Sequence, residues 1–399
     1  MKKTIHTLGL LVGLSLSVSA QDNAIDHVLQ SIEENNIQLK AAREEKKALT
    51  LETCSENNLE DPSVAYSYLY NSENSGVQQS ELTVVQSVDF PTTYAARKKS
   101  NRLQAENFQQ QYEILRRETL LQARLLCIDL IALNQQNEVL KTLTTHADSL
   151  VELYEKRVCL GEANILELNR IKMERMALLT AQADNDASHR SALQNLLAMN
   201  GNKPITFEAT RYPNLQELPP YETLRSELLP INREVLQSQA EKKVASKQLS
   251  VHRMGWLPKL EIGYRRNTSP GEEFNGFIVG GSLPIFSNKN KVKAARAREL
   301  SAELKEQEIA LQIEASLQSR YNEAQQLRKA MEGYDLKLIE ETYTLLGKAL
   351  LNGELSLPEY YIEANTVVQQ KKSYIELENR YQRLIAEIYA DKDLTPIDH

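Results

Sequence analysis

The chain has 399 residues, of which 25% are charged, 41% hydrophobic and 6% aromatic, and its formal net charge is −7. This acidic balance gives no reason to expect nucleic acid as a partner. With only 14 Gly and 12 Pro, the chain is poor in turn-forming residues for its length. That composition disfavours sandwich and α/β folds, which need many turns, and favours long helices.

The first twenty residues have the pattern of a secretory signal peptide. Lys2 and Lys3 precede an apolar run from Leu8 to Val18, and Ser19-Ala20 supplies the small residues of a cleavage site. We therefore expect the mature protein to begin at Gln21 and to leave the cytoplasm. Because Gln21 is not Cys, we expect no N-terminal lipid. Beyond this segment no apolar run approaches the ~20 residues of a membrane-spanning helix.

The remaining chain is predicted to form long helices interrupted by two pairs of strands. In the first half we expect a helix over about 24–55, strands over about 62–70 and 80–90, helices over about 93–158 and 164–199, and an extended linker to 220. In the second half we expect a helix over about 221–252, strands over about 258–266 and 275–286, helices over about 289–350 and 355–390, and a disordered tail over 392–399.

The two longest predicted helices have a coiled-coil-like seam. No Pro or Gly occurs between Tyr94 and Val158, and apolar residues recur there mostly three and four positions apart. The same spacing continues in the second half. We expect a bundle of long antiparallel helices built on these two sets: Leu133, Leu140, Leu143, Ala147, Leu150 and Tyr154, then Leu317, Tyr321, Ala324, Leu327, Met331, Tyr334 and Leu338.

The predicted strands alternate between apolar and polar side chains. In the first strand Tyr66, Tyr68 and Tyr70 share one face, and in the third strand Tyr264 lies with Leu260 and Ile262. Such alternation fits a transmembrane barrel strand and also an ordinary half-buried hairpin. Four strands cannot close a barrel, because the smallest membrane barrels have about eight. Three chains would supply twelve strands.

The two halves of the chain resemble one another. Asn36 aligns with Asn232, which places Glu45-Lys46-Lys47 on Glu241-Lys242-Lys243. The strand pairs follow in the same order, and later Gly161 aligns with Gly353, each with a Glu six residues on. Five matched elements in sequence indicate an internal duplication. We take 21–220 as the first structural repeat and 221–391 as the second.

The layout resembles the outer membrane efflux protein family, the TolC-like outer membrane factors. The resemblance covers the mature chain from Gln21 to about Asp391, and each signature is weak alone but specific in this order. The signatures are Asn36–Arg43, Leu257–Tyr264, Leu283–Ala295, Tyr154–Leu168 and Leu346–Ala364.

The family resemblance implies a homotrimer in the outer membrane. Each chain would contribute four strands to a shared twelve-stranded barrel, and helices to a periplasmic tunnel. The implied partners are a periplasmic adaptor, an inner-membrane pump of RND or ABC type, and outer-membrane lipid. The implied function is the exit duct of a tripartite efflux system, gated at its periplasmic end by the adaptor.

The resemblance also points to particular residues. The helical turns at Leu160-Gly161 and Asn352-Gly353 match the adaptor-docking tips of the family, although each glycine also serves simply to end a helix. Glu359 and, more weakly, Glu363 match the acidic ring at the entrance, although both fit a solvated helix surface. Tyr66, Tyr68, Tyr70 and Tyr264 are candidates for an aromatic girdle at the membrane interface, or for cross-strand packing.

No set of residues has the spacing of a catalytic, cofactor or metal site, so we expect neither an enzyme nor a cofactor. The three cysteines, Cys54, Cys127 and Cys159, match no disulfide or metal pattern, and we expect inert thiols that are buried or half-buried. Two other functions stay open. One is the exit duct of a type I protein secretion system, which neighbouring genes would distinguish. The other is a periplasmic coiled-coil scaffold, which would be soluble without detergent.

Overall fold

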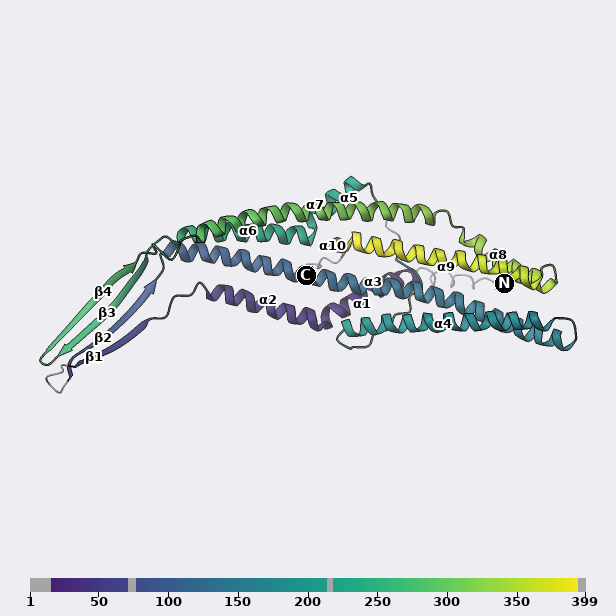
Figure 1. Ribbon diagram of the computed structural model, residues 1–399, viewed down its shortest axis with the longest axis horizontal. Helices are drawn as coiled ribbons and strands as arrows, with labels where there is room; N and C mark the ends of the chain where they lie inside the picture. The colour runs from purple at the N-terminus through teal and green to yellow at the C-terminus, as the bar shows by residue number, and fades with distance from the viewer. Residues whose placement is uncertain (1–15, 71–76, 214–217, 394–399) are drawn as a thin grey trace, which may run out of the picture. The chain divides into compact units, whose positions relative to one another are not determined.

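The structure is a computed structural model, which describes residues 16–70, 77–213 and 218–393 (Figure 1). Most of the predicted signal peptide, residues 1–15, lies outside the described residues, as does 394–399 of the predicted tail. Lys392 and Asp393 do not belong to a tail. Both backbone N–H groups donate to the Tyr389 carbonyl at 2.9 Å, so these residues end a short helix.

The described residues are mainly helical with one small antiparallel sheet, which confirms the predicted content of long helices and four strands per chain. In chain order the elements are α1 (Leu16–Asn35), α2 (Ile37–Ser55), β1 (Ser63–Tyr70), β2 (Val77–Val88), α3 (Pro91–Cys159), α4 (Ile165–Met199), α5 (Tyr221–Leu228), the 3₁₀ turn η1 (Leu229–Ile231), α6 (Arg233–Met254), β3 (Lys259–Ser269), β4 (Glu272–Ser282), α7 (Lys291–Met331), α8 (Leu336–Asn352), α9 (Leu357–Ile388) and α10 (Ala390–Asp393). Among the described helices, none is both long and apolar enough to cross a membrane.

The chain forms two compact units, and each takes segments from both halves of the sequence. Unit 1 comprises Met1–Lys40, Leu115–Leu228 and Glu314–His399, and unit 2 comprises Ala41–Ile114 and Leu229–Ile313. The units therefore differ from the predicted repeats 21–220 and 221–391. The repeat concerns the order of elements along the chain, whereas the units reflect which elements pack together.

Unit 1 is a helical bundle whose core follows the predicted seam. Leu140, Ala147, Leu150 and Tyr154 of α3 are each at most 5% exposed. A second set on α7 packs with α5 and α9, as the seam in the second half predicts. That set consists of Leu317, Tyr321, Ala324 and Leu327, with Leu224, Leu228, Tyr381 and Ile388 against it.

The helix predicted over 289–350 is wrong in one respect, because it is broken between Met331 and Leu336. Gly333 closes a tight turn, with its N–H 3.2 Å from the Ala330 carbonyl. Asp335 then caps α8, since its side chain accepts from the N–H of Leu338 at 3.0 Å. The break turns Leu338 outward, where it is 60% exposed rather than part of the seam.

Two further predicted helices are interrupted where an Asn caps a new helix. Asn36 separates α1 from α2, and its side-chain oxygen accepts from the N–H of Leu39 at 2.9 Å. Asn232 follows the turn at Pro230 and accepts from the N–H groups of Glu234 and Val235, both at 3.1 Å. Asn36 and Asn232 are the pair that the sequence alignment of the two halves places together, so the aligned residues have the same local role.

Unit 2 contains an antiparallel sheet in the order β1-β2-β3-β4. Its four strands confirm the predicted elements, although several of their ends are shifted by a few residues. The hairpin between β3 and β4 is tighter than expected and turns at Gly271, which has φ +90°. The strand β4 ends at Ser282, so Leu283–Phe286 lies beyond it; Pro284 there has no N–H to donate to a ladder.

The register places one apolar and one polar face on the sheet. Across the four strands Val64 pairs with Val84, Val84 with Tyr264, and Tyr264 with Phe277. On the opposite face the Arg265 guanidinium donates to the Glu81 carboxylate at 2.6 Å. The apolar face is exposed within the described chain: Val64 is 66%, Phe277 90% and Val279 85% exposed.

Candidate functional site

The two glycine turns predicted to be docking tips have the same geometry. Gly161 ends α3 and Gly353 ends α8, and each has φ +74°, a left-handed conformation that favours glycine. The residue after each glycine donates its N–H to the carbonyl five residues back, Glu162 to Arg157 at 2.8 Å and Glu354 to Ala349 at 2.9 Å. These bonds close the last helical turn and reverse the chain.

A capping box restarts the helix after each turn. Asn164 begins α4 and Ser356 begins α9, each three residues after its glycine. In each box the reciprocal partner is the Glu six residues after the glycine. The Glu167 carboxylate accepts from the N–H of Asn164 at 3.1 Å, and the Glu359 carboxylate accepts from the N–H of Ser356 at 3.0 Å. A glycine stop and a capping box within six residues explain why the hairpins are so short.

A single apolar cluster packs together the α3–α4 and α8–α9 hairpins of unit 1, whose ribbons Figure 1 shows. Each fully buried aliphatic side chain in such a cluster contributes about 1.5–3 kcal/mol. The Arg170 guanidinium of α4 also lies 5.7 Å from the ring centre of Tyr361 on α9. The cluster consists of Leu150 and Tyr154 from α3, Leu168 and Ile171 from α4, Leu350 from α8, and Leu357, Tyr360, Tyr361 and Ala364 from α9.

The predicted docking residues lie on the surface above this cluster. Leu160 is 72% exposed, and Asn352 is exposed. A Cβ added at Gly161 or Gly353 would meet nothing within 4 Å, so space beside both turns is open. The structure thus brings all four residues to the ends of two hairpins that share one core.

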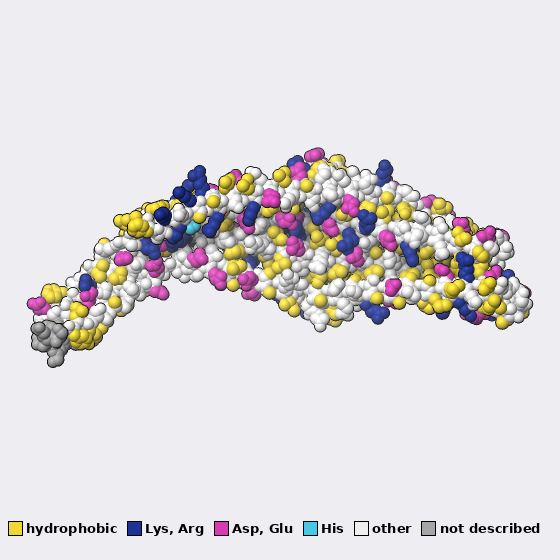
Figure 2. Space-filling model, viewed as in Figure 1, with side chains coloured by type: hydrophobic (Ala, Val, Ile, Leu, Met, Phe, Trp, Pro, Cys, Tyr) yellow, Lys and Arg dark blue, Asp and Glu magenta, His cyan; other side chains and the backbone are white. Residues whose placement is uncertain are grey.

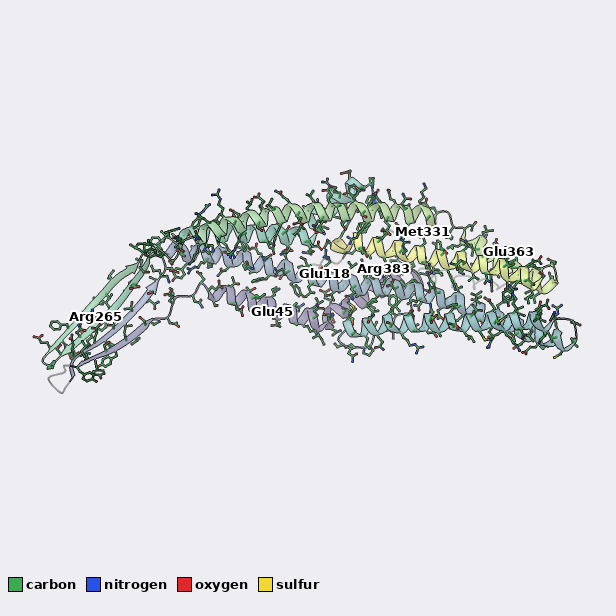
Figure 3. All side chains as sticks on the ribbon, in the orientation of Figure 1. Glu45, Glu118, Arg265, Met331, Glu363 and Arg383 are labelled. Carbon is green, nitrogen blue, oxygen red and sulfur yellow. The ribbon has the colours of Figure 1, made fainter. Side chains whose placement is uncertain are left out.

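The predicted entrance residue Glu359 has a local role that the sequence analysis did not assign to it. The Ser356 hydroxyl donates to its carboxylate at 2.6 Å, in addition to the backbone bond of the capping box. These bonds lower the pKa of Glu359, which stays charged and exposed. Glu363, labelled in Figure 3, lies one turn further along α9 and is also exposed.

The four candidate girdle tyrosines do not lie at one level of the sheet. Tyr66, Tyr68 and Tyr70 follow one another along β1, with ring centroids 4.7 Å and 6.5 Å apart. Tyr264 is level with Val64 instead, packs against Phe277, and donates its hydroxyl to Asn275 at 2.7 Å. All four are more than a third exposed, on the apolar face.

The sequence analysis missed a half-buried polar cluster that lies about two to four helical turns from the turn glycines. The Tyr360 hydroxyl lies 2.8 Å from Nδ1 of His146, and the Tyr343 ring lies 6.0 Å from the imidazole. Burial lowers the pKa of His146 and raises that of Tyr360. Because α3, α8 and α9 each contribute one residue, only the packed bundle assembles the cluster, and no local sequence motif marks it.

A hollow of about 640 Å³ lies between α3, α8 and α9, beside the start of α8. Leu336, Ile339 and Tyr343 line it from α8, and Tyr374 and Glu378 line it from α9. Burial raises the pKa of the Glu378 carboxyl. The hollow indicates that α8 is packed less tightly near the break at Gly333 than near Gly353.

The cysteine prediction is only partly right. Cys127 is buried in unit 1, where desolvation raises its pKa to about 12, so this thiol is inert as expected. Cys54 and Cys159 are exposed. Each lies at the C-terminal end of a helix, where the chain turns at the surface. In the described part of the chain, no group of three or more His, Cys, Asp or Glu is arranged to hold a metal ion.

The fold is that of several solved outer membrane channels. CusC, whose structures describe folding and transmembrane channel formation, matches with a TM-score of 0.77 at 13% identity, over 93% of this chain and 92% of CusC. The CmeC outer membrane channel of Campylobacter jejuni matches at 0.74 and 15% identity, over 92% of this chain and 85% of CmeC. The outer membrane protein VceC of Vibrio cholerae matches at 0.74 and 13% identity, over 92% of this chain and 95% of VceC.

No protein-family model matches the sequence, and no curated protein matches it either. At such low identity, the structural likeness establishes the fold, including its helical hairpins and its four-stranded sheet.

Proposed function

We propose that the protein is the outer-membrane exit duct of a tripartite efflux system. The observation that carries this proposal is the exposed apolar face of the sheet. Side chains such as Val64, Phe277 and Val279 are too numerous on one face to be scattered surface apolar residues. The strands have 8, 12, 11 and 11 residues, close to the length that spans a bilayer when tilted.

Three copies of the chain would complete the sheet. The outer edges of β1 and β4 have no strand partner in the described residues, and an unpaired edge in hydrocarbon leaves backbone groups unsatisfied. Pairing β4 of one copy with β1 of the next gives twelve strands and no edge. The apolar face would then contact lipid, and the Glu81–Arg265 pair would line the interior.

The helices also support self-association. Leu304 and Leu311 on α7 are 57% and 68% exposed, and Leu338 and Leu345 on α8 are 60% and 62% exposed. Each pair has heptad spacing, which is typical of a helix that packs lengthwise against another. Neighbouring copies in a trimer would cover these residues and build the periplasmic tunnel.

We assign the gate to the helical hairpins. Leu160, Gly161, Asn352 and Gly353 would contact a periplasmic adaptor, because they are exposed and leave open space beside both turns. Glu359 and Glu363 would form the acidic ring of the entrance, where three copies of each charge repel one another and favour cations. The energy for export would come from an inner-membrane pump.

Disulfide formation between the sheet edges tests the proposal. In a chain carrying Cys54→Ser and Cys159→Ser, one new cysteine is placed on β1 and one on β4, at Ala65 and at successive positions from Gly276 to Gly280. Oxidation in intact membranes should produce covalent dimers and trimers for at least one register. A control pair on the inner strands, Thr83→Cys with Glu261→Cys, should stay monomeric. A scaffold with free hairpins would give no register-dependent product.

A further inference from the structure

A group of unpaired cations surrounds the start of α7. We call Arg253, Lys289, Lys291, Lys293, Arg296 and Arg298 the basic patch. All six side chains are exposed, and none forms an ion pair within the described residues. Figure 2 shows Lys and Arg side chains gathered over this part of α7. Between Phe286 and Glu299 the chain has five cations and no acid.

Contacts between α6 and α7 hold the patch together. The Asn288 side-chain amide donates to the carbonyl of Gly255, which follows α6. A Cβ at Gly255 would lie 3.0 Å from the Asn288 side chain, so this close approach favours glycine. Burial lowers the pKa of His252 on α6, and the positive charges of Lys291 and Arg298 lower it further.

Exposed apolar side chains flank the patch on both connecting segments. Trp256, which follows Gly255, is 52% exposed. The segment between β4 and Lys289 exposes Leu283, Ile285 and Phe286 by 70%, 62% and 87%. Exposed apolar and aromatic residues next to unpaired Lys and Arg are typical of a surface at a membrane–water boundary.

The two lysines at the start of α7 do not stabilise the helix that carries them. Lys291 and Lys293 lie in the first turn of α7, where the helix dipole disfavours positive charge. The six cations also repel one another. Near the start of α3, which follows β2, Lys98 and Lys99 are also exposed. An anionic partner would relieve the repulsion in both places.

The structure also offers space beside the patch. A hollow of about 630 Å³ lies between α6 and α7, lined by Lys293, Arg296 and Leu300 among others. Two further lining residues, Lys242 and Glu303, form an ion pair with each other at 3.4 Å. Its lining also includes Glu299, so the hollow has mixed charge, and the cations Lys293 and Arg296 mark the side that belongs to the basic patch.

We propose that the basic patch binds the phosphate groups of anionic phospholipids at the membrane boundary nearest the helices. Trp256 and Phe286 would contact the upper acyl chains of the same lipids. This inference rests on the proposed function, because it takes the sheet that ends at Ser282 as the membrane-spanning part. It adds a lipid class and a site to that function.

The chain contains a single tryptophan, Trp256, so its fluorescence reports on this site alone. The full-length protein is reconstituted into vesicles of phosphatidylcholine with brominated acyl chains, which quench tryptophan on contact. Part of this lipid is then replaced by unbrominated phosphatidylglycerol or, for comparison, by unbrominated phosphatidylcholine. We expect phosphatidylglycerol to relieve quenching more strongly, corresponding to about a tenfold preference at low salt.

Two triple variants that each remove three positive charges show whether the lipid preference comes from the basic patch or from the net charge of the protein. Lys289→Gln, Lys291→Gln and Lys293→Gln together should reduce the preference to about twofold. The control combines Lys141→Gln, Lys329→Gln and Lys348→Gln, three exposed lysines of unit 1, and should keep the full preference.

The outcomes distinguish the two proposals. Equal relief of quenching by both lipids in an inserted protein, or equal loss in both variants, overturns the lipid site and leaves the channel proposal intact. A protein that inserts into neither kind of vesicle contradicts the channel proposal, and the lipid site with it.

Discussion

The sheet of unit 2 and the hairpin cluster of unit 1 place their apolar side chains in opposite ways. Phe277 on the sheet is 90% exposed, whereas Ile171 in the cluster is fully buried. Both regions have the periodicity of their secondary structure, so the difference does not lie in the pattern. It lies in the partner of the apolar face: other helices of the same chain cover the cluster, and nothing in the described chain covers the sheet. We infer that the two regions fold against different surroundings.

The largest expected effect comes from placing a charge on each face of the sheet. Val64→Arg should strongly reduce assembly in membranes, because an Arg facing lipid costs about 2–4 kcal/mol near the bilayer centre. Ala65→Arg, on the opposite face of the same strand, should assemble normally. The measurement is the amount of protein in the outer membrane fraction. In a sheet exposed to water, both changes would alter stability by less than about 0.5 kcal/mol, and the two variants would behave alike.

The hairpins should respond to backbone conformation rather than to surface contacts. Gly353→Ala should destabilise the turn by about 1–2 kcal/mol, because an L-residue is strained at its positive φ. Gly347→Ala, in the middle of α8, should instead stabilise by up to about 1 kcal/mol. Its Cβ would make only an ordinary contact, 3.6 Å from Nε2 of His146. Hydrogen exchange of the α8 and α9 amides measures the stability change in both variants. The same change in both would contradict the left-handed turn assigned to Gly353.

The half-buried His146 makes the hairpin region sensitive to mild acid. Since burial lowers its pKa, the folded state binds fewer protons than the unfolded state below the ordinary value of about 6.5. Its contribution is present above that pH and is lost as the pH falls through the lowered pKa. Amides of α8 and α9 should therefore exchange faster at pH 5 than the change in intrinsic rate explains. In His146→Gln this additional acceleration should disappear; if it persists, another group causes it.

The smallest expected effect separates the two acidic residues of α9. Glu359→Ala should weaken protection of the first turn of α9, because it removes the partner of Ser356, whereas Glu363→Ala should not. If both carboxylates ring the entrance, each substitution should lower the cation preference of the opened channel. Cation preference unchanged in both variants would leave Glu359 with its capping role only.

Local signals in the sequence predicted most of the elements. Alternation predicted the four strands, and apolar spacing predicted the seam at Leu140 to Tyr154. The breaks at Asn36, Asn232 and Asp335 were missed, although each has a capping side chain, because the apolar pattern continues through them. For the break at Asp335 the sequence did contain a signal, the turn residue Gly333 two positions earlier.

The candidate site was predictable only in part. The glycine turns follow from Gly161 and Gly353, whose conformation depends on local chain geometry. The capping role of Glu359 also has a local signal, Ser356 three residues earlier. The cluster of His146 with Tyr343 and Tyr360 has none, because three separate helices supply it. The exposure of Cys54 and Cys159 likewise depends on which helix ends the bundle leaves uncovered.

The mass of the particle extracted from outer membranes tests the central claim most directly. The protein would be extracted in mild detergent, and the protein part of its mass measured by light scattering. We predict the mass of three chains, since three sheets close into twelve strands. A soluble monomer or dimer recovered from the periplasm would contradict the claim, because the twelve strands would not be assembled and the apolar face of the sheet would lie in water.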